Sequence, residues 1–278
     1  MIDSLRKRQE SYESCYDFQA TRRVPLGIKV TLKNYKRFTQ NFNKPYCENF
    51  SEVIGQAALF AISQIQDAVF CYCYNDEIIF ILRNDKSHDY EPWHSNNIQK
   101  ISSSVSSLVT LGFSKNRDIF GEGLNLVGDA IFSAHVFSFP YLNEAANYLF
   151  FKQSFCMGNA AYQAASFELE NKFGKVKAQE LLKDTTYQDK LDILLKYCGI
   201  DFLDLYLHSF IYGIAVYKIP VITYTKDGDG VRKNKWHIDY EIPNFLNDRD
   251  FVSAILVNGA DVYRASDLDI NDSLPYRT

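Results

Sequence analysis

The chain has 278 residues, 46% of them hydrophobic and 15% aromatic, so it can bury a substantial core, and general disorder is excluded. No apolar run approaches the roughly 20 residues of a membrane-spanning helix, and the charged start from Met1 to Arg8 lacks the apolar core of a secretory signal. The net charge of −4 excludes a uniformly basic nucleic-acid-binding domain, so any RNA contact requires a local basic patch. We therefore expect a cytoplasmic protein without membrane contact.

The first half of the chain alternates strand and helix patterns. Apolar periodicity and turn residues predict the following elements: helix Asp3–Glu13, strand Ile28–Leu32, loop Asn41–Asn49, helix Phe50–Gln66, strands Ala68–Cys73 and Ile78–Leu82, helix Trp93–Phe113, loop Asn116–Asn125 and strand Ala130–Phe137. This βαββαβ order is typical of a ferredoxin-like antiparallel sheet with two helices on one face.

The second half is mainly helical at first. The patterns predict these elements: helices Leu142–Asn171, Lys175–Asp184 and Tyr187–Cys198, strand Gly213–Thr225, a turn at Asp227–Gly230, strand Val231–Ile238 and a polar tail from Asp261. The sequence therefore predicts an α/β (α+β) fold. A ferredoxin-like portion would span residues 1–140, and a helical and β C-terminal portion packed on it would span residues 141–278.

The six cysteines are scattered rather than paired. None of them forms the C-x-x-C spacing of a zinc ribbon, and Cys71 and Cys73 alternate along a predicted strand. We expect reduced, mostly buried thiols. The five histidines share no metal-ligand spacing either, so no zinc site is expected.

Two adjacent carboxylates mark the predicted hairpin between Cys73 and Ile78. Asn75 and Asp76 tolerate turn conformations, so Asp76 and Glu77 are expected at the hairpin tip. In phosphoryl and nucleotidyl transfer, carboxylates from neighbouring strands hold two Mg²⁺ ions. Taken alone, an Asp-Glu pair in a turn is more often only a solvated turn.

The surrounding sequence changes that balance, because an ordered set of segments resembles bacterial tRNA-His guanylyltransferase-like 3′–5′ polymerases. These segments are Asp3-Ser4-Leu5 with Arg8, Pro25-Leu26-Gly27-Ile28, Phe38-Thr39, Asn43-Lys44-Pro45, Tyr72-x-x-Asn75-Asp76-Glu77, Asn97–Ile101, Ala134-x-Val136-Phe137, Tyr148–Gln153, Gly230-Val231-Arg232 and Asp239–Asp250. They keep their order and sensible spacing over roughly residues 3–252.

The resemblance implies a palm domain that uses ATP or GTP with Mg²⁺. It also implies addition of nucleotides to tRNA or other RNA 5′ ends in the 3′–5′ direction, and a homo-oligomer, commonly a tetramer. By the same resemblance, Asp76 and Glu77 are the catalytic, metal-holding carboxylates. The implied nucleotide-binding residues are Asn75, Lys100, Lys152, Asn159 and Lys190.

The chain departs from the family's pattern at several charged positions. Thr31-Leu32 stands where the family has Asp-Gly, so the neutral hydroxyl of Thr31 replaces a metal-bridging carboxylate. Lys152 stands where the family has an Arg, and its ammonium group keeps the positive charge but cannot form the two parallel hydrogen bonds of a guanidinium. His135 replaces another Arg. A shifted carboxylate could compensate for Thr31, and Asp67 and Asp129 are the candidates to inspect.

Three functions remain open from the residues. The first is an active nucleotidyltransferase weakened at Thr31, in which lost metal binding removes transition-state stabilisation. The second is a catalytically inactive nucleotide- or RNA-binding relative that acts as a scaffold or partner subunit. The third is a polymerase that makes a small nucleotide product, because the same palm serves signalling enzymes.

Overall fold

The computed structural model describes residues 2–86, 91–121, 126–224 and 230–259. The elements are α1 (Ile2–Ser14), β1 (Leu26–Leu32), α2 (Tyr35–Phe38), α3 (Glu48–Ile62), β2 (Ala68–Tyr74), β3 (Glu77–Leu82), η1 (Trp93–Asn96), α4 (Ile98–Lys115), η2 (Arg117–Phe120), β4 (Phe132–Ser138), α5 (Leu142–Phe173), α6 (Lys175–Leu182), α7 (Tyr187–Ile193), η3 (Leu194–Cys198), α8 (Phe202–Leu205), α9 (His208–Tyr212), β5 (Ile214–Tyr224), β6 (Gly230–Asp239) and α10 (Arg249–Asn258). The predicted turn around Asp227 and the tail from Asp261 lie outside the described residues.

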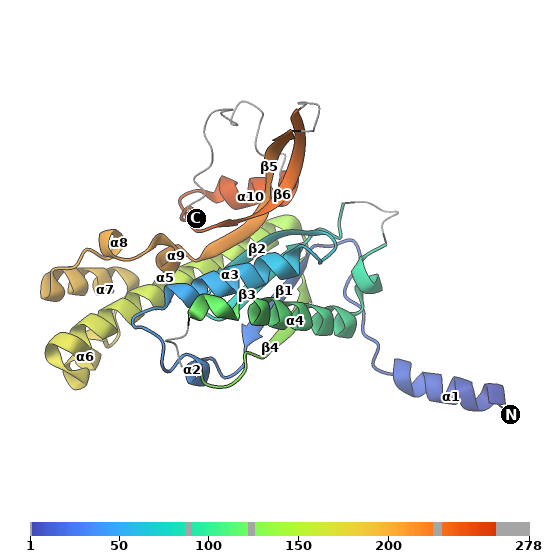
Figure 1. The fold of residues 1–278 in the computed structure, drawn as a ribbon, viewed down its shortest axis with the longest axis horizontal. Helices are drawn as coiled ribbons and strands as arrows, with labels where there is room; N and C mark the ends of the chain where they lie inside the picture. Colours follow the sequence, from blue (N-terminus) through green and yellow to red (C-terminus); the bar gives the residue numbers. More distant parts are fainter. Residues whose placement is uncertain (1, 87–90, 122–125, 225–229, 260–278) are drawn as a thin grey trace.

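A six-stranded antiparallel sheet organises the chain (Figure 1). Its strand order is β4-β1-β3-β2-β5-β6. The first four strands, with α3 and α4 between them in sequence, have the ferredoxin-like arrangement, so the predicted α+β fold with βαββαβ order is confirmed. β5 pairs with β2, so the sheet combines strands from both halves of the chain.

Helices α3 and α4 cover one face of this sheet. Alternate residues of β1 and β3, such as Ile28, Val30 and Phe80, point into this layer and are fully buried with the apolar stripe of α3. Asn97 fixes the start of α4, because its side chain accepts a hydrogen bond from the backbone N–H of Lys100 at 2.9 Å. This cap explains why the helix begins at Ile98, and the predicted start at Trp93 is instead a short 3₁₀ turn.

The opposite face is also covered, by α5 and α10, which the prediction of helices on a single face did not include. Phe70 and Tyr72 of β2 pack there against Leu149 of α5 and Ile255 of α10. β2 is apolar on both sides, as expected for a strand that lies between two helical layers. Helix α10 had no prediction from the sequence.

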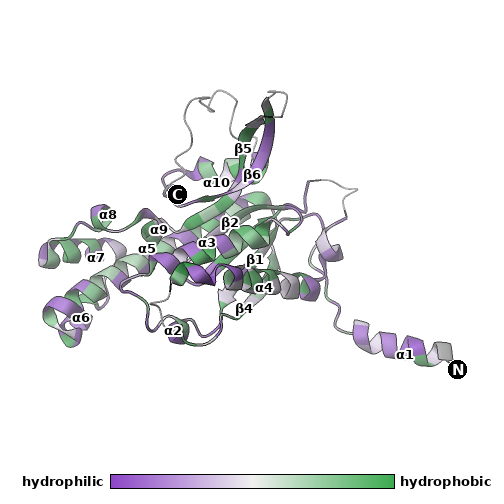
Figure 2. Ribbon diagram, in the orientation of Figure 1, coloured by the Kyte–Doolittle hydropathy of each residue, from purple (hydrophilic) through white to green (hydrophobic). Residues whose placement is uncertain are grey.

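The second half of α5 leaves the sheet and forms a third core cluster with α6 to α9. Figure 2 shows hydrophobic residues concentrated on the sheet and along this helical portion, whereas α1 is largely hydrophilic. Residues 4–14 of α1 are exposed, and this helix lies apart from the sheet (Figure 1). None of the described helices is long and apolar enough to cross a membrane.

Candidate active site

The hairpin between β2 and β3 turns through Asn75 and Asp76. Asn75 has a φ of 46°, a left-handed conformation that asparagine tolerates better than most residues. The backbone carbonyl of Asp76 accepts a hydrogen bond from the N–H of Leu32 at 3.2 Å. The hairpin tip is thereby attached to the end of β1, which brings the predicted carboxylates beside Thr31.

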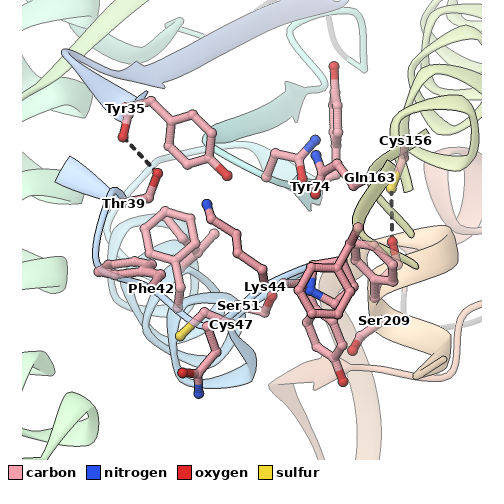
Figure 3. Close-up of a pocket in the computed structure, with 18 of the residues that line it drawn as sticks. Tyr35, Thr39, Phe42, Lys44, Cys47, Ser51, Tyr74, Cys156, Gln163 and Ser209 are labelled. Atoms are coloured by element: carbon pink, nitrogen blue, oxygen red, sulfur yellow. Dashed lines mark hydrogen bonds between the residues drawn. The ribbon is translucent and has the colours of Figure 1, made fainter. Parts of the chain in front are cut away.

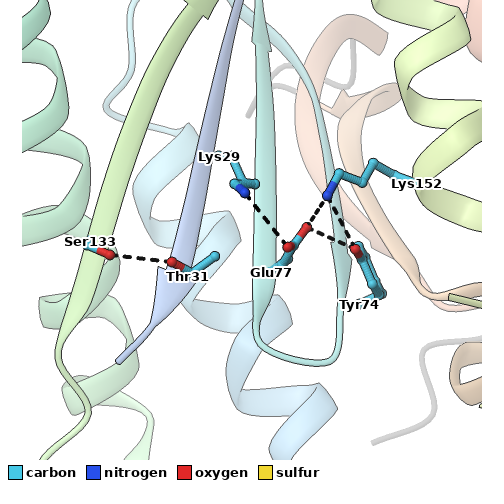
Figure 4. Close-up of polar contacts among 6 residues, drawn as sticks. All are labelled: Lys29, Thr31, Tyr74, Glu77, Ser133 and Lys152. Carbon is cyan, nitrogen blue, oxygen red and sulfur yellow. Dashed lines mark hydrogen bonds and ion pairs between the residues drawn. The ribbon is translucent and has the colours of Figure 1, made fainter. Parts of the chain in front are cut away.

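A row of polar side chains crosses the sheet at this end, on the face that α5 covers. Strand register aligns Thr31 with Ser133 of β4 on one side and with Glu77 of β3 on the other, and Glu77 with Tyr74 of β2. The hydroxyl groups of Thr31 and Ser133 lie 3.3 Å apart and share a hydrogen bond (Figure 4). The position where the family pattern has a carboxylate is therefore engaged in a neutral contact between two hydroxyl groups.

Glu77 is held by two lysines and a tyrosine (Figure 4). The Nζ of Lys152 lies 2.6 Å from its Oε2, and the hydroxyl of Tyr74 donates to the same oxygen at 2.9 Å. The Nζ of Lys29 lies 4.0 Å from Oε1. The side chains of Lys152 and Glu77 are only 11% and 20% exposed, so their ion pair is largely shielded from water.

Burial raises the pKa values of several groups around the hairpin. It raises the pKa of Asp76, and the neighbouring charge of Glu77 raises it further, while the ammonium groups of Lys29 and Lys152 act in the opposite direction. Burial also raises the pKa of Tyr35 to about 12, with a smaller contribution from the charge of Asp76. The carboxylates thus lie in a partly desolvated environment, where unbalanced charge is costly.

A pocket of about 480 Å³ opens beside the hairpin tip (Figure 3). Its walls come from the segment between β1 and α3, from the hairpin and from α5 and α9. Its lining includes Tyr35, Lys36, Phe42, Lys44, Tyr46 and Asn75. Tyr46 is stacked on Phe210 of α9, with ring centroids 4.6 Å apart. The pocket therefore combines aromatic walls with lysines next to the carboxylate hairpin.

The structure brings together five of the residues that the sequence singled out. Thr31, Asp76, Glu77 and Lys152 meet at the sheet end, and Asn75 lines the adjacent pocket.

The other three predicted residues differ in their distance from this site. Asn159 follows Lys152 by seven residues on α5, which puts the two on about the same helix face roughly 10 Å apart. Lys100 is exposed near the start of α4, and this start is attached to the far end of β3 by a hydrogen bond between Asn84 and Asn96. Lys190 donates to the carbonyl oxygens of Thr185 and Thr186 just before α7. Lys100 and Lys190 thus do not join the cluster at the hairpin, and their phosphate contacts stay predictions.

The two candidate carboxylates that could compensate for Thr31 do not reach it. Asp67 precedes β2 at the end opposite the hairpin, about 20 Å away along a seven-residue strand. Asp129 is 87% exposed and lies 3.6 Å from the guanidinium of Arg117. Neither candidate therefore compensates for Thr31, because β2 separates Asp67 from the site and Asp129 is directed to Arg117.

The donor groups at the sheet end do not fit a two-Mg²⁺ site. Among the residues that the structure describes, no group of three or more His, Cys, Asp or Glu side chains could hold a metal ion. One oxygen of Glu77 already accepts from Lys152 and Tyr74. A divalent cation about 4 Å from an ammonium group would be repelled by about 8 kcal/mol at an effective dielectric constant of 20.

Sequence reasoning missed the role of Lys29 and of the pocket segment. The alternation of side chains along β1 predicts that Lys29 lies on the same face of the sheet as Thr31, because the two residues are two positions apart. The pocket has no such signal, since residues 35–47 meet α5 only in the folded chain.

Three features together define a palm-type α+β protein. They are a ferredoxin-like sheet, an acidic hairpin tip, and helix α5 on the sheet face opposite α3 and α4. Residues 6–140 match the family model of tRNAHis guanylyltransferase (Thg1). The chain is 26% identical over 202 residues to tRNA(His) guanylyltransferase 2 of Arabidopsis thaliana. The aligned segment covers 70% of this chain and 36% of that protein. It is also 26% identical over 181 residues to the tRNA(His) guanylyltransferase of Schizosaccharomyces pombe. This aligned segment covers 64% of this chain and 67% of that protein.

Solved structures share the fold. A bacterial tRNA(His) guanylyltransferase (Thg1)-like protein in complex with ATP has a TM-score of 0.74 at 22% identity, covering 91% of this chain and 99% of the other. The tRNA(His) guanylyltransferase of Saccharomyces cerevisiae has a TM-score of 0.65 at 18% identity, covering 80% of this chain and 94% of the other. The chain is therefore similar to tRNA(His) guanylyltransferases, through the family model over residues 6–140 and through the shared fold over most of its length.

Proposed function

We propose that the chain binds ATP or GTP in the pocket beside the hairpin and serves nucleotidyl transfer to the 5′ end of a tRNA or other RNA. The observation that carries this proposal is the position of the pocket, whose wall includes Asn75 next to Asp76 and Glu77. The bacterial relatives of the same fold, described in complexes with ATP and with GTP, support a nucleoside triphosphate as the ligand.

The pocket has the size and chemistry for a nucleotide. A volume of about 480 Å³ lies in the range of small-molecule and cofactor sites. The rings of Tyr35, Phe42 and Tyr46 offer flat surfaces on which a purine can stack. Lys44 extends into the pocket (Figure 3), and Lys36 also lines it, so the phosphate groups can meet positive charge.

A second candidate function is an inactive relative that binds nucleotide or RNA as a scaffold or partner subunit. The contact of Glu77 with Lys152 and the contact of Thr31 with Ser133 favour it, because both occupy groups that a metal-dependent transfer would need. The family's homo-tetramer stays a proposal for this chain, whereas its Mg²⁺ requirement is not carried over, because the groups that the structure describes at the sheet end do not fit a two-Mg²⁺ site.

Calorimetry of ATP and GTP binding tests the proposal. We expect saturable binding to the native chain and about tenfold weaker binding for Lys44→Ala, because a charge-assisted phosphate contact is lost. Lys177→Ala is the control, since Lys177 lies on the surface of α6, 2.8 Å from Glu180. Absence of binding to the native chain, or equal losses of affinity in both variants, would contradict the proposal.

Extension of a triphosphate-activated tRNA 5′ end then separates the two candidate functions, the active nucleotidyltransferase and the inactive binding relative.

A further inference from the structure

Positive charge surrounds Glu77 on both sides. Lys152 lies 2.6 Å from one carboxylate oxygen and Lys29 lies 4.0 Å from the other. With Asp76 next to Glu77, the cluster contains two acidic and two basic groups. The charge that a divalent cation supplies to a pair of carboxylates is thus already supplied by two ammonium groups.

The packing of the fold fixes the lysine on Glu77. Lys152 projects from α5 between Leu149 and Gln153, of which the first is fully buried and the second is 1% exposed. Gln153 anchors the helix by donating to the carbonyl oxygen of Pro243 and accepting from the N–H of Phe245.

Aromatic rings complete the surroundings of this ammonium group. Its Nζ lies 5.6 Å from the ring centroid of Tyr148 and 5.9 Å from that of Tyr74. The ammonium of Lys152 therefore occupies a built position, unlike a lysine on a solvated surface, where side-chain entropy opposes pairing.

We propose that the ammonium of Lys152, with Lys29 beside it, is the resident cation of this site, so that the chain binds its anionic ligand without a divalent metal ion. The identity of that ligand as a nucleoside triphosphate rests on the proposed function. The charge balance itself does not, because it involves only protein groups. Thr31 supports the inference, since its neutral hydroxyl contacts Ser133 and stands where the family pattern has a further carboxylate for a bridging metal ion.

Mn²⁺ binding without nucleotide tests the charge replacement directly. Free Mn²⁺ is measured by electron paramagnetic resonance with the native chain, with Thr31→Asp/Lys152→Met, and with Thr31→Asp/Lys177→Met as the matched control. We expect no saturable site in the native chain or in the control and one site in the Thr31→Asp/Lys152→Met variant. A saturable native site that Glu77→Gln removes would overturn the inference, as would equal binding by the two double variants.

The native chain alone provides a second test, which holds even if the Lys152 variant fails to fold. ATP binding is compared in EDTA and in Mg²⁺, with the native chain and with Glu77→Gln. We expect less than a twofold effect of Mg²⁺ on the native affinity. A tenfold or larger gain that disappears in Glu77→Gln overturns the inference. If ATP does not bind under either condition, the proposed nucleotide function fails, and the Mn²⁺ measurement decides the inference independently.

Discussion

The contact between Lys152 and Glu77 predicts strong energetic coupling between the two side chains. Lys152→Met keeps most of the alkyl packing against α5 but leaves the carboxylate of Glu77, 20% exposed, with Tyr74 and the more distant Lys29. Breaking a fully buried ion pair from one side costs about 3–5 kcal/mol. Residual exposure and Lys29 reduce this, so we expect each of Lys152→Met and Glu77→Gln to cost about 2 kcal/mol.

The double variant Lys152→Met/Glu77→Gln removes both charges of the close ion pair, and Lys29 keeps the neighbouring charge of Asp76. The hydroxyl of Tyr74 can still donate to the amide oxygen of the new Gln, so we expect a total cost of about 2 kcal/mol instead of the additive 4 kcal/mol. The coupling energy is then about 2 kcal/mol. Urea unfolding at neutral pH, followed by circular dichroism and the fluorescence of the two tryptophans, measures all four free energies of unfolding.

The pair Lys177 and Glu180 is the matched control for this cycle. It has a similar N···O distance of 2.8 Å, but its side chains are 53% and 68% exposed. Because water and salt screen exposed pairs, we expect no coupling beyond experimental error. Additive effects for Lys152 and Glu77, or coupling equal to that of the surface pair, would refute the reasoning that burial makes this ion pair important.

Two further predictions concern the backbone and the thiols. Gly213→Ala should lower the free energy of unfolding in urea by about 2–4 kcal/mol, because the φ of Gly213 is +83° and an added Cβ would lie 2.7 Å from a backbone oxygen. Gly158→Ala on α5 is the control. Its added Cβ meets nothing within 4 Å, so this variant should be neutral or stabilising by up to about 1 kcal/mol. Burial raises the pKa of Cys156 to about 12 and the pKa of Cys71 well above its usual range. At pH 8, iodoacetamide should therefore modify the exposed Cys15 of the native chain long before these two buried thiols. Early labelling of either buried thiol, detected by mass spectrometry, would contradict the packing.

The strand and helix patterns predict most of the fold because they reflect local burial. The alternation of Ile28, Val30 and Leu32 and the hairpin signal at Asn75-Asp76 both correspond to elements in the structure. Helix α2 was missed because its four residues leave no room for periodicity to appear. Helix α10, which has ten residues and follows a loop that contains Pro243, was also missed.

The candidate site could be predicted only in part. Asp76 and Glu77 follow from a local motif, and their position at a hairpin tip needs only the turn. The two lysine partners of Glu77 do not follow from a local motif, because Lys29 reaches it across a strand pair and Lys152 reaches it from a helix 75 residues away in sequence. Asp67 shows the converse, since it is close to the hairpin in sequence and a whole strand away in space.

The sequence by itself determined the order of strands and helices, the family resemblance and the loss of a carboxylate at Thr31. These properties depend on residue identity and on spacing along the chain, which a single sequence contains. Only the tertiary structure decided that Lys152 and Lys29 balance the charge of Glu77 and that a pocket lies beside them. Both depend on how α5 packs across the sheet, and that packing is a sum of many long-range contacts that no local pattern records.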